Sequence, residues 1–312
     1  MASSVNAHIH YNPESTVRAG TTLVKAIYLK RINKLLQHDP KEVITRMEQI
    51  RQSLGRFANF RVLVIADITK LERPVSSWDT LTASLDTNEP LLPLTSRKEF
   101  VSDAGRNPGR ITYIIPMSTI DSSFAHFSSR GLQSHSDPKL PALMVALAYL
   151  DAVEGPMWVA VRGTGLAYGV NFNYNLETGI IGFRVYRSPD TFKAYRAART
   201  VVEDFISGKT EFDKNALEGA ISSIVVQFAN EQTTMFYAAV LGFTNLVVKG
   251  IAKDWSQGIL KKVRDIGVDD IKDVLQSLVL PCFTPGKANV VAACATIMQE
   301  VSTLYLVYSF LS

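Results

Sequence analysis

The clearest periodic pattern in the chain is the stretch Gly169-Val-Asn-Phe-Asn-Tyr-Asn-Leu-Glu-Thr-Gly-Ile-Ile-Gly-Phe-Arg-Val-Tyr186. Apolar and polar side chains alternate with a period of two over residues 169–175, which is typical of a strand with one buried face. A short Leu-Glu-Thr connection leads from there into residues 179–186. The stretch therefore predicts an antiparallel β-hairpin.

Further strands and helices are predicted on both sides of this hairpin. Residues 139–150 are apolar almost all round, which is typical of a buried helix, and Asp190 offers a capped start to a second helix. The apolar runs at 110–116 and 289–294 predict two more strands, the second followed by a C-terminal apolar helix. Strands that alternate with helical blocks indicate the α+β class, and we expect an antiparallel-rich mixed sheet with helices packed on one face.

The beginning of the chain predicts a separate set of elements. Residues 1–13 are polar and aperiodic, so we expect them to be poorly ordered. Apolar residues at helical spacing predict helices over residues 15–39 and 43–54. The β-branched run at residues 61–67 then predicts a strand that is buried on both faces.

A domain boundary is predicted after this strand. Residues 82–109 are rich in Pro, Ser, Thr, Asp, Asn and Gly without a sustained period, which is typical of a linker. We therefore expect a partial domain over residues 1–85 and a complete domain over residues 86–312. The apolar run at residues 235–248 has about 14 residues against the roughly 20 that a membrane span needs, so we expect a buried core helix and no membrane insertion.

Composition limits the classes of function. The 312 residues are 46% hydrophobic and 20% charged, which is ordinary for a globular protein and argues against a disordered chain. The 33 Lys and Arg residues are scattered and only slightly outnumber the 29 Asp and Glu residues, so no nucleic-acid partner is expected. Cys282 and Cys294 fit neither a redox pair nor a zinc ribbon. With no secretory signal in the sequence, we expect two buried thiols in the cytoplasm.

A glycine-rich cluster, Arg162-Gly-Thr-Gly-Leu-Ala-Tyr-Gly169, is the first candidate for a functional site. Its Gly163, Gly165 and Gly169 form a GxGxxxG pattern that invites comparison with a dinucleotide-binding loop. A phosphate-binding loop has to open a helix, however, so that backbone N–H groups and the helix dipole meet the anion. Here a strand follows, so nucleotide binding ranks third among the hypotheses.

The histidines do not indicate a metal site. No HxxEH or HExxH motif occurs, and none of the five histidines is paired at helical ligand spacing. His8 and His10 lie in the opening segment, where we expect no fixed geometry for a metal. His126 and His135 have serines as neighbours, but nothing fixes a Ser-His-Asp arrangement, and both are expected to be exposed loop residues. No metal ligands are therefore predicted in this chain.

At the glycine-rich cluster the sequence resembles a known family. Residues 143–169, with Gly155-Pro-Met-Trp158 ahead of the cluster, and the segment Phe183-Arg-Val-Tyr-Arg-Ser-Pro-Asp190 resemble the C-terminal half of the pitrilysin/insulinase family of zinc metallopeptidases. The presequence-protease-like branch is the most similar. The resemblance extends from about Arg110 to the C-terminus, and residues 61–67 resemble the closing strand of a preceding homologous domain.

This resemblance implies a domain of the mitochondrial-processing-peptidase type and a chamber made of two halves. The N-terminal half carries the inverted HxxEH zinc site, and the C-terminal half closes over the peptide. Arg162 and Tyr168 match an arginine and a tyrosine that the C-terminal half sends across the chamber, which implies substrate binding by both and transition-state support by Tyr168. Gly163, Gly165 and Gly169 then form a tight turn beside the approaching peptide.

The sequence departs from the family because it contains no zinc-ligand motif. We therefore expect zinc to be bound in a missing N-terminal half or a partner subunit, and we do not expect this chain to hydrolyse peptides on its own. Its expected role is the substrate-binding, chamber-closing half of a peptide-degrading zinc metallopeptidase. The alternative is a noncatalytic structural or interaction protein derived from the same family, and homo-oligomerisation through an exposed apolar face stays open.

Overall fold

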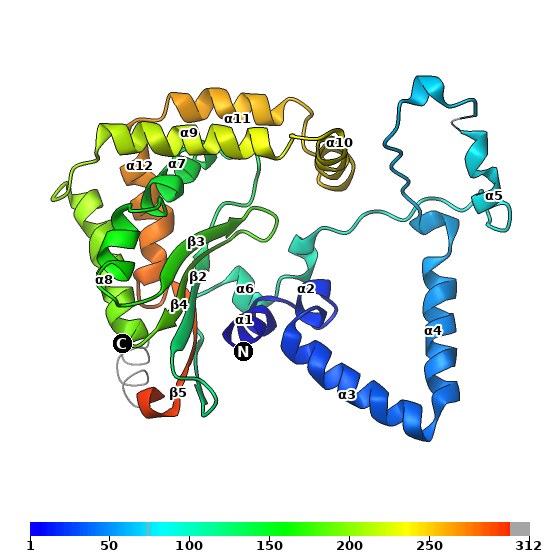
Figure 1. Cartoon of the computed structure of the whole chain (residues 1–312), viewed down its shortest axis with the longest axis horizontal. Helices are drawn as coiled ribbons and strands as arrows, with labels where there is room; N and C mark the ends of the chain where they lie inside the picture. The colour runs from blue at the N-terminus through cyan, green and yellow to red at the C-terminus, as the bar shows by residue number, and fades with distance from the viewer. Residues whose placement is uncertain (74, 300–312) are drawn as a thin grey trace. The chain divides into compact units, whose positions relative to one another are not determined.

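The computed structural model describes residues 1–73 and 75–299. The chain divides into two compact units by its internal contacts (Figure 1). Unit 1 contains residues 1–24, 96–229 and the chain from residue 254 onward, and unit 2 contains residues 25–95 and 230–253.

Unit 1 is built on a mixed sheet of five strands: β1 (Thr112–Met117), β2 (Ser123–Arg130), β3 (Gly169–Asn175), β4 (Ile180–Ser188) and β5 (Ala288–Ala295). The strand order is β1-β5-β2-β4-β3. Strand β1 pairs with β5 in parallel, and the other pairs are antiparallel. The expected α+β class is confirmed, as are the β3–β4 hairpin and the strands at the two predicted apolar runs.

Strand β2 corrects the expectation that His126 lies in an exposed loop. Its central place in the sheet buries Ser129, whose hydroxyl lies 3.1 Å from the Cys282 thiol. Because polar residues such as Ser129 occupy buried positions in β2, the hydropathy pattern of the sequence does not predict this strand. His135 lies in a turn, as expected, but it is half-buried rather than exposed, because its ring packs edge-on against Trp255 with 5.6 Å between the ring centres.

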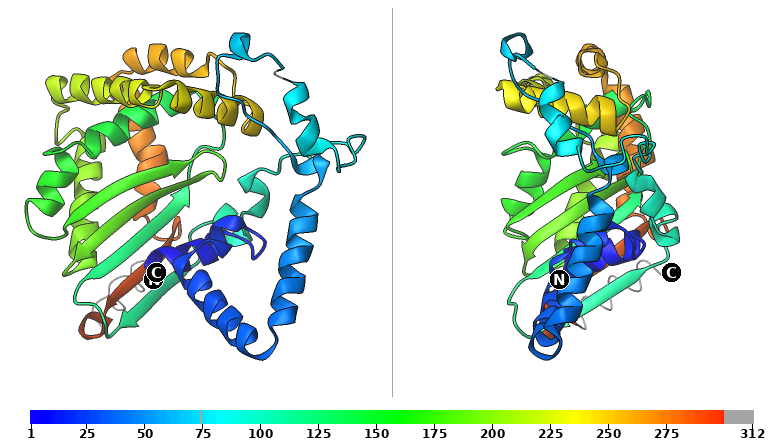
Figure 2. Two further views of the ribbon diagram at one scale, coloured as in Figure 1. Left: turned by 45° about the vertical axis from the view of Figure 1, so that its right-hand side comes forward. Right: turned by 90° about the vertical axis from the view of Figure 1, so that its right-hand side faces the viewer.

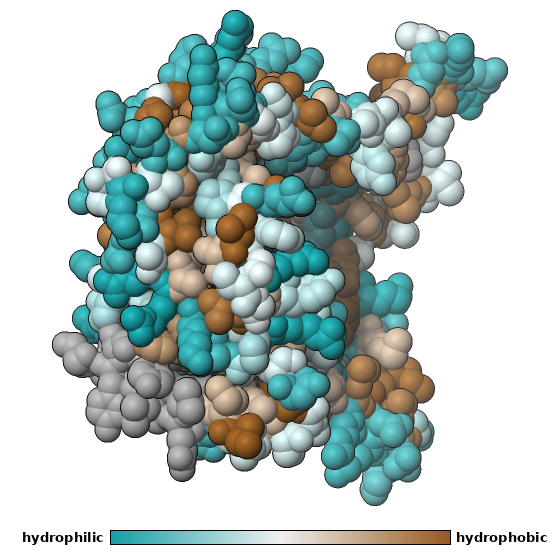
Figure 3. All heavy atoms as spheres, turned by 60° about the vertical axis from the view of Figure 1, so that its left-hand side comes forward, coloured by the Kyte–Doolittle hydropathy of each residue, from teal (hydrophilic) through white to brown (hydrophobic). Residues whose placement is uncertain are grey.

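One face of the sheet is covered by a helical layer (Figures 1 and 2). Helix α7 (Leu140–Leu150) is buried along nearly its whole length, as its apolar composition predicts. Asp190 begins helix α8 (Thr191–Ser207), because its carboxylate accepts hydrogen bonds from the backbone N–H groups of Phe192 and Lys193. The layer also contains α9 (Lys214–Asn230), α11 (Trp255–Arg264), α12 (Val268–Val274), η7 (Leu275–Val279) and η8 (Leu280–Phe283). Seen from the side of these helices, the surface mixes hydrophilic and scattered hydrophobic residues (Figure 3).

The opposite face of the sheet is partly covered by the N-terminal segment. Helix α1 (Ala2–His10) places Ala2 and Ile9 in a second apolar cluster with Val291 and Ala293 of β5. The expectation of a poorly ordered N-terminus is therefore wrong, because small and apolar residues at helical spacing give this segment a side that can be buried. Unit 1 also contains the short helices α2 (Thr16–Ala19), η4 (Arg97–Phe100) and α6 (Asp103–Arg106).

Unit 2 contains no strand within the described residues. Its elements are α3 (Thr22–His38), which begins in unit 1, α4 (Pro40–Leu54), η1 (Phe57–Asn59), η2 (Ile68–Lys70), η3 (Ser76–Trp78), α5 (Asp79–Thr82), α10 (Met235–Phe243) and η6 (Thr244–Val248). The predicted strand over residues 61–67 is wrong, because this segment pairs with no strand in the part of the chain that the structure describes, and Val62 is 50% exposed. That residues 1–85 end a preceding homologous domain stays a prediction.

The apolar segment at residues 235–248 is helical, but it is not buried as expected. Met235 is 72% and Phe236 is 59% exposed. An apolar sequence favours a buried helix, but it does not show which other element of the fold packs against that helix. Among the helices of residues 1–73 and 75–299, none combines the length and the apolar character needed to cross a bilayer. The predicted C-terminal apolar helix lies outside the described residues.

Candidate functional site

The glycine-rich cluster forms a compact reversal between a single π-helical turn, η5 (Trp158–Arg162), and strand β3. The backbone N–H of Gly165 donates to the carbonyl of Arg162 at 2.9 Å. Gly165 has φ +76°, which a residue with a Cβ adopts only under strain. A Cβ at Gly163 would lie 2.9 Å from the Val159 carbonyl oxygen, whereas a Cβ at Gly169 would meet nothing within 4 Å. The turn therefore has a backbone requirement at Gly163 and Gly165 but not at Gly169.

This reversal brings the predicted site residues Arg162 and Tyr168 together. The guanidinium carbon of Arg162 lies 4.9 Å from the centre of the Tyr168 ring and 5.9 Å from that of Trp158. Tyr168 is 60% exposed, and Arg162 is exposed as well. The backbone N–H of Tyr168 donates to the Arg187 carbonyl at 2.9 Å and ties the residue to β4. The two side chains thus form an accessible cation–π pair at the start of β3.

Two residues of β4 extend this pair across the sheet. Tyr186 is the register partner of Gly169, and its ring centre lies 6.1 Å from that of Tyr168 in an edge-on contact. The guanidinium carbon of Arg184 lies 5.3 Å from the Tyr186 ring centre. We call Arg162, Tyr168, Tyr186 and Arg184 the arginine–tyrosine ladder. Arg184 and Tyr186 were not predicted as site residues from the sequence, although their alternation with the buried Phe183 and Val185 indicates that they share one face of the strand.

The ladder carries positive charge that is not compensated nearby. Within the described residues, neither Arg162 nor Arg184 forms an ion pair. By contrast, Arg199 on α8 pairs with Glu203 at 2.8 Å. An unpaired guanidinium stacked on an aromatic ring keeps its N–H groups available at the ring edge, so both arginines can still donate hydrogen bonds to a bound molecule.

A cavity of about 250 Å³ lies next to the ladder, between α1 and strands β2, β3 and β4. His126 lines this cavity and is the register partner of Arg184. Burial is the main cause that lowers the pKa of His126 to about 4, and the charge of Arg184 acts in the same direction, so the ring is neutral at pH 7. Its Nε2 atom lies 3.0 Å from the Ser3 hydroxyl of α1. The polar residues that line the cavity also include Asn6, His10, Tyr11, Ser128, Asn173, Asn175 and Thr178.

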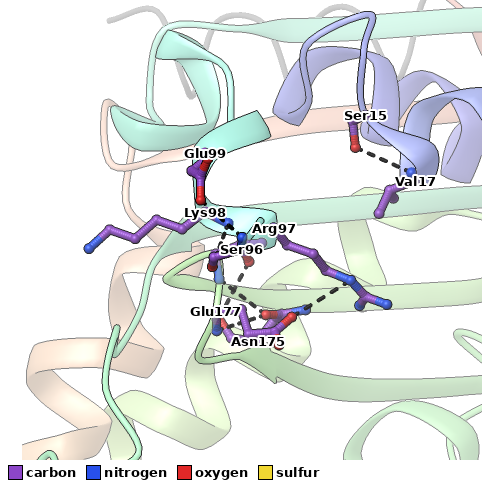
Figure 4. Close-up of polar contacts among 9 residues, drawn as sticks. Ser15, Val17, Ser96, Arg97, Lys98, Glu99, Asn175 and Glu177 are labelled. Atoms are coloured by element: carbon purple, nitrogen blue, oxygen red, sulfur yellow. Dashed lines mark hydrogen bonds and ion pairs between the residues drawn. The ribbon is translucent and has the colours of Figure 1, made fainter. Parts of the chain in front are cut away.

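The turn between β3 and β4 forms one wall of this cavity, and residues 96–101 contact this turn. Arg97 lies 3.6 Å from the Glu177 carboxylate, and the Asn175 side chain accepts a hydrogen bond from the Glu177 backbone N–H at 3.0 Å (Figure 4). Ser96 and Glu99 form a capping box that starts η4 and so orients Arg97. The turn is therefore tethered at its tip as well as by its strand pairing.

The described residues do not fit a zinc site. No group of three or more His, Cys, Asp or Glu side chains in residues 1–73 and 75–299 is placed to hold a metal ion. His10 instead uses both ring nitrogens within the fold, with Nδ1 2.7 Å from the Asn6 carbonyl and Nε2 3.3 Å from the Asn289 amide. The thiols of Cys282 and Cys294 are both buried, as expected.

Comparison with curated proteins identifies long, uncharacterised relatives. No family model matches the chain. An uncharacterised protein of Schizosaccharomyces pombe is 30% identical over 298 residues, which are 93% of this chain and 28% of the relative. An uncharacterised protein of Saccharomyces cerevisiae is 27% identical over 305 residues, which are 94% of this chain and 29% of the relative. The chain thus spans less than a third of the length of these relatives.

Solved structures with a similar fold include peptidases. A protease from Helicobacter pylori aligns with a TM-score of 0.54 at 11% identity, over 70% of this chain and 51% of that one. A peptidase M16 inactive domain from Pseudomonas fluorescens aligns with a TM-score of 0.52 at 13% identity, over 70% and 49%. The periplasmic protease PqqL from Escherichia coli aligns with a TM-score of 0.51 at 11% identity, over 72% and 24%. The sheet and helical layer of this chain therefore have the pitrilysin-like fold of M16 peptidase domains.

Proposed function

We propose that this chain is the substrate-binding, chamber-closing half of a peptide-degrading zinc metallopeptidase. The observation that carries the proposal is the exposed pair of Arg162 and Tyr168, which the turn after η5 brings within 4.9 Å of each other. The M16 peptidase fold supports it. In this proposal the zinc is bound by another part of the protein or by a partner subunit, and kinship with the presequence-protease-like branch is part of the same proposal.

The two side chains have distinct roles in the proposed site. The guanidinium of Arg162 offers several fixed donors to peptide carbonyls or to a carboxylate. The phenol of Tyr168 donates a hydrogen bond to the oxygen that becomes negatively charged as the peptide bond is attacked. Arg162 therefore acts mainly on peptide affinity, and Tyr168 acts mainly on the rate of the reaction completed by the zinc-bearing half.

Strand β3 supports an extended peptide in the same place. It is the outer strand next to β4, so within residues 1–73 and 75–299 its other edge has no strand partner. An extended peptide can add to such an edge through main-chain hydrogen bonds. One edge donor is already used, because the Phe172 N–H donates to the Asp151 carboxylate at 2.8 Å. The proposed peptide therefore pairs with the part of β3 nearest Tyr168.

The cytoplasm is the proposed compartment. The buried cysteine side chains Cys282 and Cys294 support a reducing environment. Homo-oligomerisation stays a prediction.

Peptide binding by single variants tests the proposal. We expect Arg162→Ala to weaken the binding of an unstructured fluorescent peptide by at least about tenfold, because it removes charge-assisted hydrogen bonds worth about 1.5–3 kcal/mol. Arg196→Ala is the matched control, since Arg196 also stacks on an aromatic ring, Phe192 of α8, at 5.8 Å but lies outside the site. Fluorescence anisotropy measures both. Equal affinities for wild type, Arg162→Ala and Arg196→Ala would refute the proposal and favour the structural or interaction role.

A further inference from the structure

We infer that the arginine–tyrosine ladder and the cavity beside it select acidic peptides, whose carboxylates bind at Arg162 and Arg184. The inference rests on the proposed function and adds the chemical class of the substrate. Nothing in the resemblance to metallopeptidases singles out Arg184, and its place follows only from the pairing of β4 with β2 and β3.

The charges around the ladder favour an anion. Arg162 and Arg184 have no ion pair within the described residues, and Glu177, at the tip of the neighbouring turn, is already paired with Arg97. None of the described residues that line the cavity is an aspartate or glutamate. A carboxylate that arrives here therefore meets two guanidinium groups and no nearby unpaired negative charge in the described site.

Because the two arginines are stacked on rings, they are better suited to bind a carboxylate, which has two oxygens, than an anion that offers a single acceptor atom. A guanidinium held over a ring presents its N–H groups in a planar fork, which matches the two oxygens of a carboxylate. Tyr186 holds Arg184 at 5.3 Å and is itself held by Phe124 at 5.4 Å between ring centres. Less side-chain freedom is then lost when a ligand binds.

The length of the ladder defines the spacing of the two acidic groups. The guanidinium carbons of Arg162 and Arg184 are joined by three consecutive contacts of 4.9, 6.1 and 5.3 Å. Because an extended chain rises by about 3.3 Å per residue, a peptide segment of about five residues can span these contacts laid end to end. The ladder thus fits two carboxylates separated by no more than about five positions of an extended peptide.

The cavity offers neutral hydrogen-bond donors beside Arg184. The Asn173 side chain lies over Gly182, since a Cβ at Gly182 would come within 2.4 Å of the Asn173 amide oxygen. The amide of Asn173 and the neutral ring of His126 both face the cavity. These groups can donate to a carboxylate paired with Arg184 without adding a competing negative charge.

Matched peptides test the inference. We use a fluorescein-labelled Ala/Gly/Ser peptide of about twelve residues with two glutamates about five positions apart, and the same peptide with both replaced by glutamine. We expect the wild-type chain to bind the glutamate peptide about tenfold more tightly. In Arg184→Gln this ratio falls toward one while affinity for the glutamine peptide changes little. In Arg162→Gln the ratio also falls, and affinity for both peptides decreases because Arg162 also donates to peptide carbonyls, whereas Arg196→Gln keeps the full ratio. Raising the salt concentration from about 50 to about 300 mM also reduces the ratio.

The outcomes separate this inference from the proposed function. Equal affinity of the wild-type chain for both peptides would overturn the preference for acidic peptides and leave peptide binding intact. Binding of neither peptide would overturn the proposed function as well. Amidation of the peptide C-terminus separates the two possible sources of the bound carboxylate. If the ratio of affinities for the glutamate and glutamine peptides is unchanged by amidation, the glutamate side chains of the peptide provide the carboxylates that bind. Discrimination that persists in the double variant Arg162→Gln/Arg184→Gln would also refute the inference.

Discussion

Replacing Asn289 by leucine is expected to destabilise unit 1 more than most single substitutions. Asn289 is fully buried in β5. Its side-chain oxygen accepts hydrogen bonds from the backbone N–H groups of Gly109 at 2.9 Å and Arg110 at 3.3 Å. Its amide nitrogen donates to the Ala104 carbonyl at 2.8 Å and to Nε2 of His10 at 3.3 Å. One side chain thus joins β5 to α1 and to the segment that leads into β1.

The expected magnitude follows from these contacts. Leucine has a similar size, so the packing is largely kept while four hydrogen bonds are lost. A buried polar group left without a partner costs about 1–3 kcal/mol. Counting the two contacts at 3.3 Å as weak, we expect Asn289→Leu to lower the free energy of unfolding by about 4 kcal/mol.

Urea unfolding followed by tryptophan fluorescence measures this effect. With a slope of about 3 kcal/mol per molar urea, the midpoint should fall by about 1.3 M. Asn173→Leu is the control, because Asn173 is exposed on β3 and should leave the midpoint nearly unchanged. A decrease of less than about 0.3 M for Asn289→Leu would show that this hydrogen-bond cluster does not stabilise the fold as reasoned.

Two further predictions concern the site itself. Gly165→Ala should lower stability by about 1–2 kcal/mol, because φ at this residue is +76°, whereas Gly169→Ala should be nearly neutral in the same thermal melts; equal effects would contradict the backbone argument. Stability should fall as the pH drops from 6.5 to about 4, because burial, assisted by the charge of Arg184, lowers the pKa of His126, so that only the unfolded state takes up this proton. The His126→Gln variant should therefore lose less stability than wild type across this window in urea titrations, and an unchanged pH slope would show that His126 is not the group responsible.

Local patterns predicted the elements whose partners are near in sequence. The β3–β4 hairpin, the buried helix α7 and the start of α8 at Asp190 all follow from residues a few positions apart, and all are confirmed. The errors occur where burial depends on distant residues. Residues 61–67 have the composition of a buried strand but pair with no strand among the described residues. The β2 serines are buried under distant elements, since Ser129 lies 3.1 Å from Cys282 of η8 and Ser128 lies 3.3 Å from Asn6 of α1.

The site shows the same division. Arg162 and Tyr168 could be named from the sequence because they lie on one short turn and resemble a family motif. Arg184 and Tyr186 join them only through the register that sets Tyr186 opposite Gly169.

The sequence alone determines that this protein is an α+β chain with a β-hairpin, a buried helix and a glycine-rich turn that bears an arginine and a tyrosine. These features can be predicted because hydropathy period, helix caps and turn residues act over a few positions of the chain. Tertiary structure alone decides which strands are neighbours, that α1 lies against β5, and that Arg162 and Arg184 are linked through the rings of Tyr168 and Tyr186. Those features arise from pairings between residues far apart in the chain, whose energies no local pattern contains.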